Sequence, residues 1–169
     1  TYITQGIIPC IKHLPGHGQA TTDPHLGLPI INKPLSELAD DFRPFIDLND
    51  SPCGMTAHIV LSALDTNHPI TQSPIGINFI RQELGFKGFL ISDAIDMHAL
   101  KGTISDKAEQ SLRAGCDCVC YCGGNIAEMQ ELVAVKHYLE AGSLSRFAAM
   151  TQILHNQSSP ISLNYADYA

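Results

Sequence analysis

Short apolar runs alternate with amphipathic segments along the chain. The apolar runs predict four strands, at residues 7–11, 54–60, 89–92 and 117–122. The segments between and after them predict helices over residues 36–45, 74–84, 106–114, 126–141 and 144–155. Continuous apolar strands that alternate with helices are typical of a parallel sheet covered by helices. The pattern therefore predicts an α/β fold of about four parallel β/α units.

Capping residues support several of these helix boundaries. Ser73 followed by Pro74 is a typical helix start, and Gly115 is a typical helix end. Ser36 is expected to cap the first helix, with Pro44 close to its end.

Polar and ionisable residues gather where each predicted strand ends. Lys12, His13, His58 and Asp93 all occupy this position. In (β/α)8 barrels of the TIM type, the carboxyl ends of the strands carry the active site. Such barrels usually have about 250 residues and eight units, so four units make about half of one. Because the chain has no linker-like boundary, we interpret residues 1–169 as one unit that is part of such a barrel.

The net charge and the distribution of basic residues limit the kinds of binding partner that we expect. The chain carries a formal net charge of −7 and has a pI near 5.5, with its Lys and Arg residues scattered. Nucleic acids and anionic membranes attract clustered basic residues, so neither is an expected partner. The strongly apolar runs are about six or seven residues long, which is too short to span a bilayer.

The cysteines do not suggest a disulfide framework. Four of them, Cys116, Cys118, Cys120 and Cys122, alternate along the last predicted strand and its approach, so their side chains share one face. Thiols in that arrangement are badly oriented for disulfides, and they cannot enclose zinc without further ligands. We expect buried, reduced thiols and no metal site. Reduced thiols favour a cytoplasmic location.

Three clusters could support chemistry: residues 12–18 (KHLPGHG), 22–25 (TDPH) and 91–97 (ISDAIDM). Each has a simpler alternative. Asp93 could cap a turn that begins at Ala94, and Asp23 and His25 could belong to an Asx-type turn. Lys12 could form a Schiff base in a lyase.

Taken together, the clusters favour glycoside hydrolysis. A retaining glycosidase needs one carboxylate at the anomeric carbon and a second group that protonates the leaving oxygen. Asp93 at a strand end suits the first role. His25 suits the second because imidazole exchanges protons near neutral pH, and Asp23 could orient it. We interpret His58 and His68 as structural or solvated.

The same strings resemble the family 3 glycoside hydrolases. Residues 12–18 and 23–29 (DPHLGLP) are similar to the signature of the β-N-acetylglucosaminidases of that family, and so is the segment 55–60 (MTAHIV). Residues 81–88 (RQELGFKG), followed by 92–97 (SDAIDM), are similar to the segment that carries the nucleophile of the family. The resemblance extends from about residue 6 to residue 124.

The resemblance implies a role for each matching residue. Asp93 matches the nucleophile, His25 the general acid/base and Asp23 its partner, while Lys12 and His13 match a pair that binds sugar hydroxyls. An Asp–His pair implies the β-N-acetylglucosaminidase branch, which in bacteria releases N-acetylglucosamine from muropeptides during peptidoglycan recycling. That branch uses no metal and no organic cofactor.

The chain departs from the family pattern in two places. Pro24 stands where family members have a small hydroxylated residue, and Pro stiffens the backbone. The first strands of the family barrel, which supply an Asp and an Arg to the sugar site, have no counterpart. The expected unit is therefore the C-terminal half of the barrel with the N-terminal half missing. The alternative function is an inactive fragment that binds sugar weakly or self-associates through open barrel edges.

Overall fold

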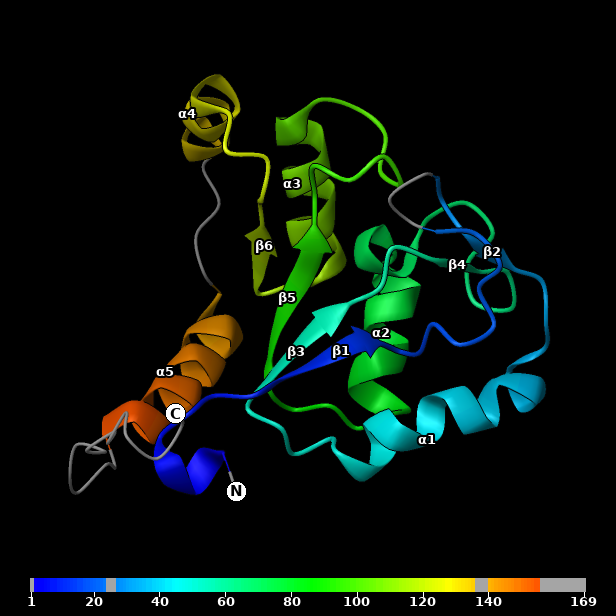
Figure 1. Ribbon diagram of the computed structural model, residues 1–169, viewed down its shortest axis with the longest axis horizontal. Coiled ribbons are helices and arrows are strands. Elements are labelled where there is room, and N and C mark those ends of the chain that lie inside the picture. Colours follow the sequence, from blue (N-terminus) through cyan, green and yellow to red (C-terminus); the bar gives the residue numbers. More distant parts are fainter. Residues whose placement is uncertain (1, 24–26, 136–139, 156–169) are drawn as a thin grey trace, which may run out of the picture.

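The computed structural model describes residues 2–23, 27–135 and 140–155, and Figure 1 shows the arrangement of its elements. In chain order these are η1 (Ile3–Gln5), β1 (Cys10–Leu14), β2 (Ile30–Ile31), η2 (Leu35–Leu38), α1 (Ala39–Asp47), β3 (Cys53–Thr56), β4 (Val60–Leu61), η3 (Ile70–Gln72), α2 (Pro74–Gln82), β5 (Phe89–Ala94), α3 (Ile104–Ala114), β6 (Cys118–Cys120), α4 (Ile126–Ala134) and α5 (Ala141–His155).

A four-stranded parallel sheet organises the fold. Its strand order is β1-β3-β5-β6, and each neighbouring pair is parallel. A helix follows each of the first three strands before the next begins, as in a β/α barrel. The predicted α/β fold with about four parallel units is confirmed, and the sheet forms an arc of a barrel of the TIM type.

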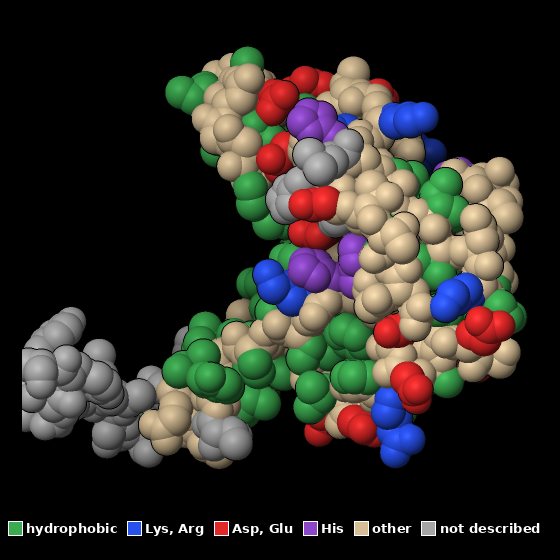
Figure 2. All heavy atoms as spheres, turned by 45° about the vertical axis from the view of Figure 1, so that its right-hand side comes forward, with side chains coloured by type: hydrophobic (Ala, Val, Ile, Leu, Met, Phe, Trp, Pro, Cys, Tyr) green, Lys and Arg blue, Asp and Glu red, His purple; other side chains and the backbone are tan. Residues whose placement is uncertain are grey.

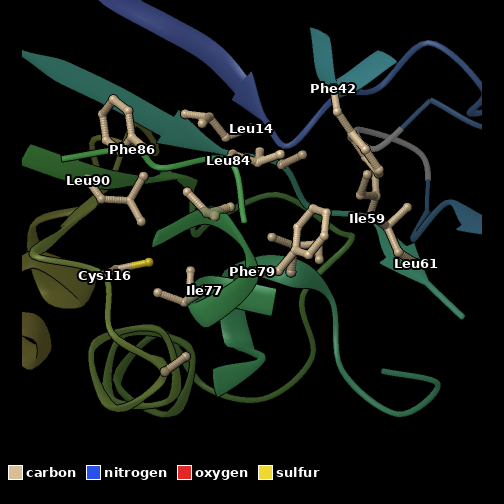
Figure 3. Packing of buried hydrophobic residues seen from close by; sticks show 14 of the residues in the cluster. Leu14, Phe42, Ile59, Leu61, Ile77, Phe79, Leu84, Phe86, Leu90 and Cys116 are labelled. Carbon is tan, nitrogen blue, oxygen red and sulfur yellow. The ribbon is translucent and has the colours of Figure 1, made fainter. Parts of the chain in front are cut away.

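The helices pack against one face of this arc. Figure 3 shows the core beneath them, where Leu14, Leu90 and Phe86 meet Ile77 of α2. Gly54 of β3 faces the same side, and a Cβ there would lie 2.6 Å from the side chain of Leu14. Glycine is therefore required for close packing at that position.

The opposite face of the sheet is more open. At its amino-terminal end Phe89 of β5 contacts Phe147 of α5, with ring centroids 5.6 Å apart. Because side chains alternate along a strand, Met55 and Ile91 point away from the side that holds Gly54 and Leu90. Both side chains are partly exposed. Figure 2 shows a hollow in the surface, with charged and histidine side chains gathered at its wall.

The boundaries of all four predicted strands differ from the sequence expectation, and β5 extends to Ala94, so that Asp93 is its penultimate residue. The first strand begins at Cys10 and extends through His13 to Leu14. The second ends at Thr56, and Val60 belongs instead to β4, which pairs with β2 in a separate two-stranded sheet. This small sheet lies beyond the end of β3 (Figure 1).

The last strand is shorter than predicted. It spans only Cys118–Cys120, so Cys122 lies in the turn that follows. The expectation that the thiols are buried also holds only in part, since Cys10 and Cys122 are exposed.

Helix capping was predicted well for α2 and α3 and wrongly for α1. The Ser73 side chain accepts a hydrogen bond from the Gly76 backbone N–H, and Gly115 ends α3 in the left-handed region, at a φ of 115°. Helix α3 begins at Ile104, earlier than expected. Pro44 lies inside α1 rather than near its end, while Ser36 lies within η2 and caps nothing.

Among the residues that the structure describes, no helix is both long enough and apolar enough to cross a membrane.

Candidate active site

A pocket of about 690 Å³ opens at the carboxyl ends of the strands. Its wall consists of residues from the end of β1 and the loop after it, the end of β5, and the segments that follow β5 and β6: Lys12, His13, His17, Asp93, Ala94, Asp96, Met97, His98 and Cys122. Three of the five predicted site residues, Lys12, His13 and Asp93, therefore lie together in one pocket.

One carboxylate oxygen of Asp93 accepts a hydrogen bond, and the other faces His13. Its Oδ1 accepts a hydrogen bond from the Ala94 backbone N–H at 2.8 Å, and its Oδ2 lies 3.6 Å from Nε2 of His13. The Asp93 side chain is 16% exposed. No helix begins at Ala94, since the next one starts at Ile104. A turn does begin there, closed by a hydrogen bond from the Met97 N–H to the Ala94 carbonyl oxygen at 3.1 Å, so Asp93 also caps a turn as the simpler alternative expected.

Lys12 and His13 enter the pocket from the end of β1. Burial lowers the pKa of His13 below its ordinary value, and this outweighs the opposing effect of the Asp93 charge. The neutral imidazole can then donate one hydrogen bond and accept another. Lys12 is exposed and supplies a positive charge at the rim.

The loop after β1 keeps these two residues in place. The peptide bonds Lys12–His13 and Leu14–Pro15 are both cis. Gly16 has a φ of 143°, and a Cβ at that position would lie 2.7 Å from the backbone oxygen of Asp41 in α1. The glycine of the KHLPGHG string therefore allows the loop to pass directly over α1.

A buried hydrogen-bond chain fixes the backbone on both sides of the Asp93 carboxylate. The Asp93 N–H donates to Oγ1 of Thr56 at 3.4 Å, and that hydroxyl lies 2.8 Å from Oγ1 of Thr71. The Thr71 hydroxyl lies 2.8 Å from Nδ1 of His58, whose Nε2 lies 3.0 Å from the Ala94 carbonyl oxygen. Because a carbonyl only accepts, the proton of the neutral ring is on Nε2.

His58 is fully buried, and burial is the main reason why its pKa lies below the ordinary value. The structural interpretation of His58 is thus confirmed: it holds the strand end that carries Asp93. His68 is mostly exposed and pairs with Asp65 at 3.2 Å, away from the pocket.

Two histidines and one aspartate of the pocket were not among the predicted site residues: His17, His98 and Asp96. His17 and Asp96 belong to the same strings that contain His13 and Asp93, so proximity within a motif could have indicated them. The backbone N–H of Cys122 donates to Oδ1 of Asp96 at 2.8 Å and joins the turn after β6 to the loop after β5. Within the described ranges, no group of three or more potential ligands is arranged to hold a metal ion.

The predicted Asp–His pair falls at the edge of the described residues. Asp23 is exposed, and its backbone oxygen accepts a hydrogen bond from the Gly27 N–H at 3.1 Å. Residues 24–26, which include Pro24 and His25, lie outside the described ranges. The pairing of Asp23 with His25 therefore stays a prediction.

A second polar centre lies at the opposite, amino-terminal end of the sheet. The Asp117 side chain is fully buried just before β6, where it accepts hydrogen bonds from Arg81 of α2, from Arg146 and Ser143 of α5, and from the backbone of Leu90. These donors hold the pKa of Asp117 below its ordinary value although burial opposes them. The cluster attaches two helices to the sheet.

Comparison with known proteins agrees with this arrangement. Residues 3–156 match the family described as glycosyl hydrolase family 3 N terminal domain. This chain belongs to that family. Its pocket lies at the carboxyl ends of the strands, as expected for a family 3 barrel.

Relatives of known sequence and structure are similar over most of the chain. A β-hexosaminidase of Bordetella pertussis is 33% identical over 138 residues, which are 78% of this chain and 39% of that protein. The structure of NagZ from Neisseria gonorrhoeae in complex with N-trifluoroacetyl-D-glucosamine is 30% identical, with a TM-score of 0.71 over 86% of this chain and 44% of that one. A family 3 β-N-acetylglucosaminidase from Paenibacillus shares the fold, with a TM-score of 0.81 at 24% identity, over 94% of this chain and 34% of that one. The chain thus spans less than half the length of each of these relatives.

Proposed function

We propose that this chain forms part of the catalytic barrel of a β-N-acetylglucosaminidase, which hydrolyses terminal β-linked N-acetylglucosamine with retention of configuration. One observation carries the proposal: the Asp93 carboxylate stands in an open pocket that Lys12 and His13 also line, with His13 3.6 Å away. The similarity to β-hexosaminidases supports the choice of an amino sugar.

The proposed reaction has two steps. In the first, the free oxygen of Asp93 attacks the anomeric carbon while the bond to the leaving group breaks and His25 protonates the departing oxygen. In the second, His25 takes a proton from water, the water attacks the anomeric carbon and the bond to Asp93 breaks. Asp23 orients His25 and stabilises its charged form, which exists before the first step and again after the second.

Lys12 and His13 hold the sugar while Asp93 attacks. A neutral His13 both donates to and accepts from hydroxyl groups, and the Lys12 ammonium donates only. The hydrogen-bond chain through Thr56, Thr71 and His58 fixes the direction of the Asp93 carboxylate, and such positioning lowers the barrier to attack.

The proposed substrates are muropeptides in the cytoplasm of a bacterium, and the reaction needs neither metal nor organic cofactor. We further propose that the first strands of the barrel come from a preceding segment of the same gene product. Those strands would cover the face that exposes Met55 and Ile91 and would complete the sugar site.

Substrate hydrolysis tests this function in the full-length product of the gene. Release of nitrophenol from the aryl β-N-acetylglucosaminide should exceed release from the matched β-glucoside, and NMR of the first product should show the β anomer. Equal rates on the two glycosides would contradict the amino-sugar assignment, and a first-formed α anomer would contradict retention.

A second candidate function rests on the open edges of the sheet. Within the described residues, β1 pairs only with β3, and β6 pairs only with β5. Unpaired edges favour association with another chain. An inactive unit that self-associates would sediment as a dimer or larger and would not release nitrophenol, whereas sedimentation as a monomer would exclude it.

A further inference from the structure

Two thiols lie close together where β6 ends. Sγ of Cys120, the last residue of the strand, is 3.7 Å from Sγ of Cys122 in the following turn. Two residues at alternate positions of a regular strand would point in parallel and stay apart. Because the strand stops at Cys120, the turn brings the second thiol back toward the first.

The remaining cysteines are in different surroundings. Cys116 is fully buried, and burial raises its pKa to about 12. The pKa of Cys118 is raised to about 12 for the same main reason. Cys53 is buried opposite Cys10 on the neighbouring strand. Cys10 and Cys53 also bring an exposed thiol next to a buried one. The Cys120–Cys122 pair differs from them because its exposed member, Cys122, lines the pocket, with its sulfur 3.7 Å from that of Cys120.

We propose that Cys120 and Cys122 form an oxidisable dithiol, which a hydroperoxide closes into a disulfide at the wall of the pocket. The exposed Cys122 reacts first, because its sulfur is accessible to solvent. Burial and the neighbouring Cys122 raise the pKa of Cys120 to about 11, so this second thiol stays protonated until the first has been oxidised.

Oxidation of the two thiols to a disulfide proceeds in two steps. With hydrogen peroxide, the Cys122 sulfur attacks one peroxide oxygen, the O–O bond breaks, and a sulfenic acid and one water form. The Cys120 sulfur then attacks the sulfenic sulfur, the S–OH bond breaks, and the hydroxyl leaves as a second water with the Cys120 proton. Two thiols are oxidised and one hydroperoxide is reduced.

Closure would change the pocket because only one of the two residues is firmly held. The Cys120 backbone N–H donates to Oγ of Ser92, and the Cys120 carbonyl accepts from the Ile95 N–H. Cys122 is an exposed turn residue that lines the pocket and donates to Asp96. Shortening the S–S distance to about 2.05 Å therefore moves Cys122 toward Cys120 and pulls its N–H away from Asp96.

Mass spectrometry of this chain after brief treatment with hydrogen peroxide tests the proposal directly. The peptide over residues 114–136 should lose about two daltons, the two thiol hydrogens, and should regain them with glutathione because an exposed disulfide is easily reduced. In Cys120→Ser the loss should disappear and Cys122 should instead become a sulfenic acid that dimedone traps. In Cys122→Ser neither product should form.

Cys118→Ser is the matched control, since it removes the neighbouring thiol on the same strand. This variant should lose the same two hydrogens as the wild type. The proposal is overturned if Cys118→Ser abolishes the loss, or if the disulfide joins Cys10 to Cys53, which a tryptic digest would reveal as a link between two peptides. The proposal would also be overturned if peroxide left the thiols of the wild type unchanged while circular dichroism showed that the chain was folded.

A second readout rests on the proposed function. In the full-length product, peroxide should raise KM for the aryl β-N-acetylglucosaminide several-fold, reductant should restore it, and Cys120→Ser should not respond. Disulfide formation with unchanged KM would refute the effect on the pocket but leave the dithiol intact. Absence of hydrolysis before treatment would count against the proposed function alone.

Discussion

Asp93 and Asp117 are two carboxylates at opposite ends of the same sheet, and they differ in how fully they are satisfied. Asp117 is fully buried and is bonded by two arginines, a serine hydroxyl and a backbone N–H. Asp93 is 16% exposed, with one hydrogen bond to its neighbouring N–H and one oxygen 3.6 Å from His13. A carboxylate whose hydrogen-bonding positions are all filled, such as Asp117, stabilises the fold. A carboxylate in a pocket with an oxygen left open, such as Asp93, remains available to a substrate.

The largest effect is expected from Asp93→Asn in the full-length product. Hydrolysis of the aryl β-N-acetylglucosaminide should fall by roughly 10³-fold or more, because removing a nucleophile eliminates the covalent route. The midpoint of urea unfolding should change little, since the side-chain amide oxygen of the asparagine can still accept the hydrogen bond from the Ala94 N–H. Asp96→Asn is the control in the same pocket and should retain far more activity.

Asp117→Asn should give the opposite result, with a large loss of stability. Removing this charge leaves Arg81 and Arg146 without a counter-charge, and breaking a buried pair costs about 3–5 kcal/mol. Urea unfolding of this chain measures the change. Asp47→Asn, which breaks the exposed pair with Arg43, should cost at most about 1 kcal/mol. Equal losses of unfolding free energy in Asp117→Asn and Asp47→Asn would contradict the structural role assigned to Asp117.

A smaller effect is expected from the chain of hydroxyls below Asp93. Thr71→Val removes the partner of Nδ1 of the buried His58 ring and one of the partners of the Thr56 hydroxyl, and an unmade buried hydrogen bond costs about 1–3 kcal/mol. Thr71→Ser keeps the hydroxyl and should lose less. In the full-length product, Thr71→Val should also lower kcat more than it raises KM, whereas a purely structural role would change stability alone.

The smallest effect concerns pH. The folded protein lowers the pKa of His58 and His13 below the ordinary value of 6.5, so the unfolded chain binds more protons between the folded and unfolded pKa values. Stability should therefore be complete above pH 6.5 and fall as the pH decreases through that window. Unfolding at a series of pH values measures the slope, which His58→Asn should reduce. A stability that rises on acidification would contradict the neutral assignment of these rings.

The sequence predicted the parallel sheet because its strands are continuous apolar runs, and it located Asp93 because a polar residue follows directly after one of them. It could not predict that Val60 joins β2 in a second sheet, since periodicity does not show which strands pair. The buried ion cluster of Asp117 was also missed. Its partners Arg81 and Arg146 are far apart in sequence, and only the packing of α2 and α5 brings them together.

The cysteines illustrate the same limit on a smaller scale. Their alternation predicted parallel side chains, but that inference depends on the strand continuing through Cys122. Because β6 ends at Cys120, the spacing of the last pair is set by a turn. The local sequence pattern correctly predicted a strand. Where that strand ends, which sets the distance between the Cys120 and Cys122 thiols, depends on the pairing of β5 with β6.

Trapping the covalent intermediate tests the central assignment most directly. The full-length product would be incubated with a 5-fluoro N-acetylglucosaminyl fluoride, which slows the second step, and the tryptic peptide over residues 88–101 would be fragmented. That peptide contains both Asp93 and Asp96, so fragmentation distinguishes the two carboxylates of the pocket. The proposed mechanism predicts a glycosyl group on Asp93. A sugar attached to Asp96, or turnover of the reagent with no peptide modified, would contradict it.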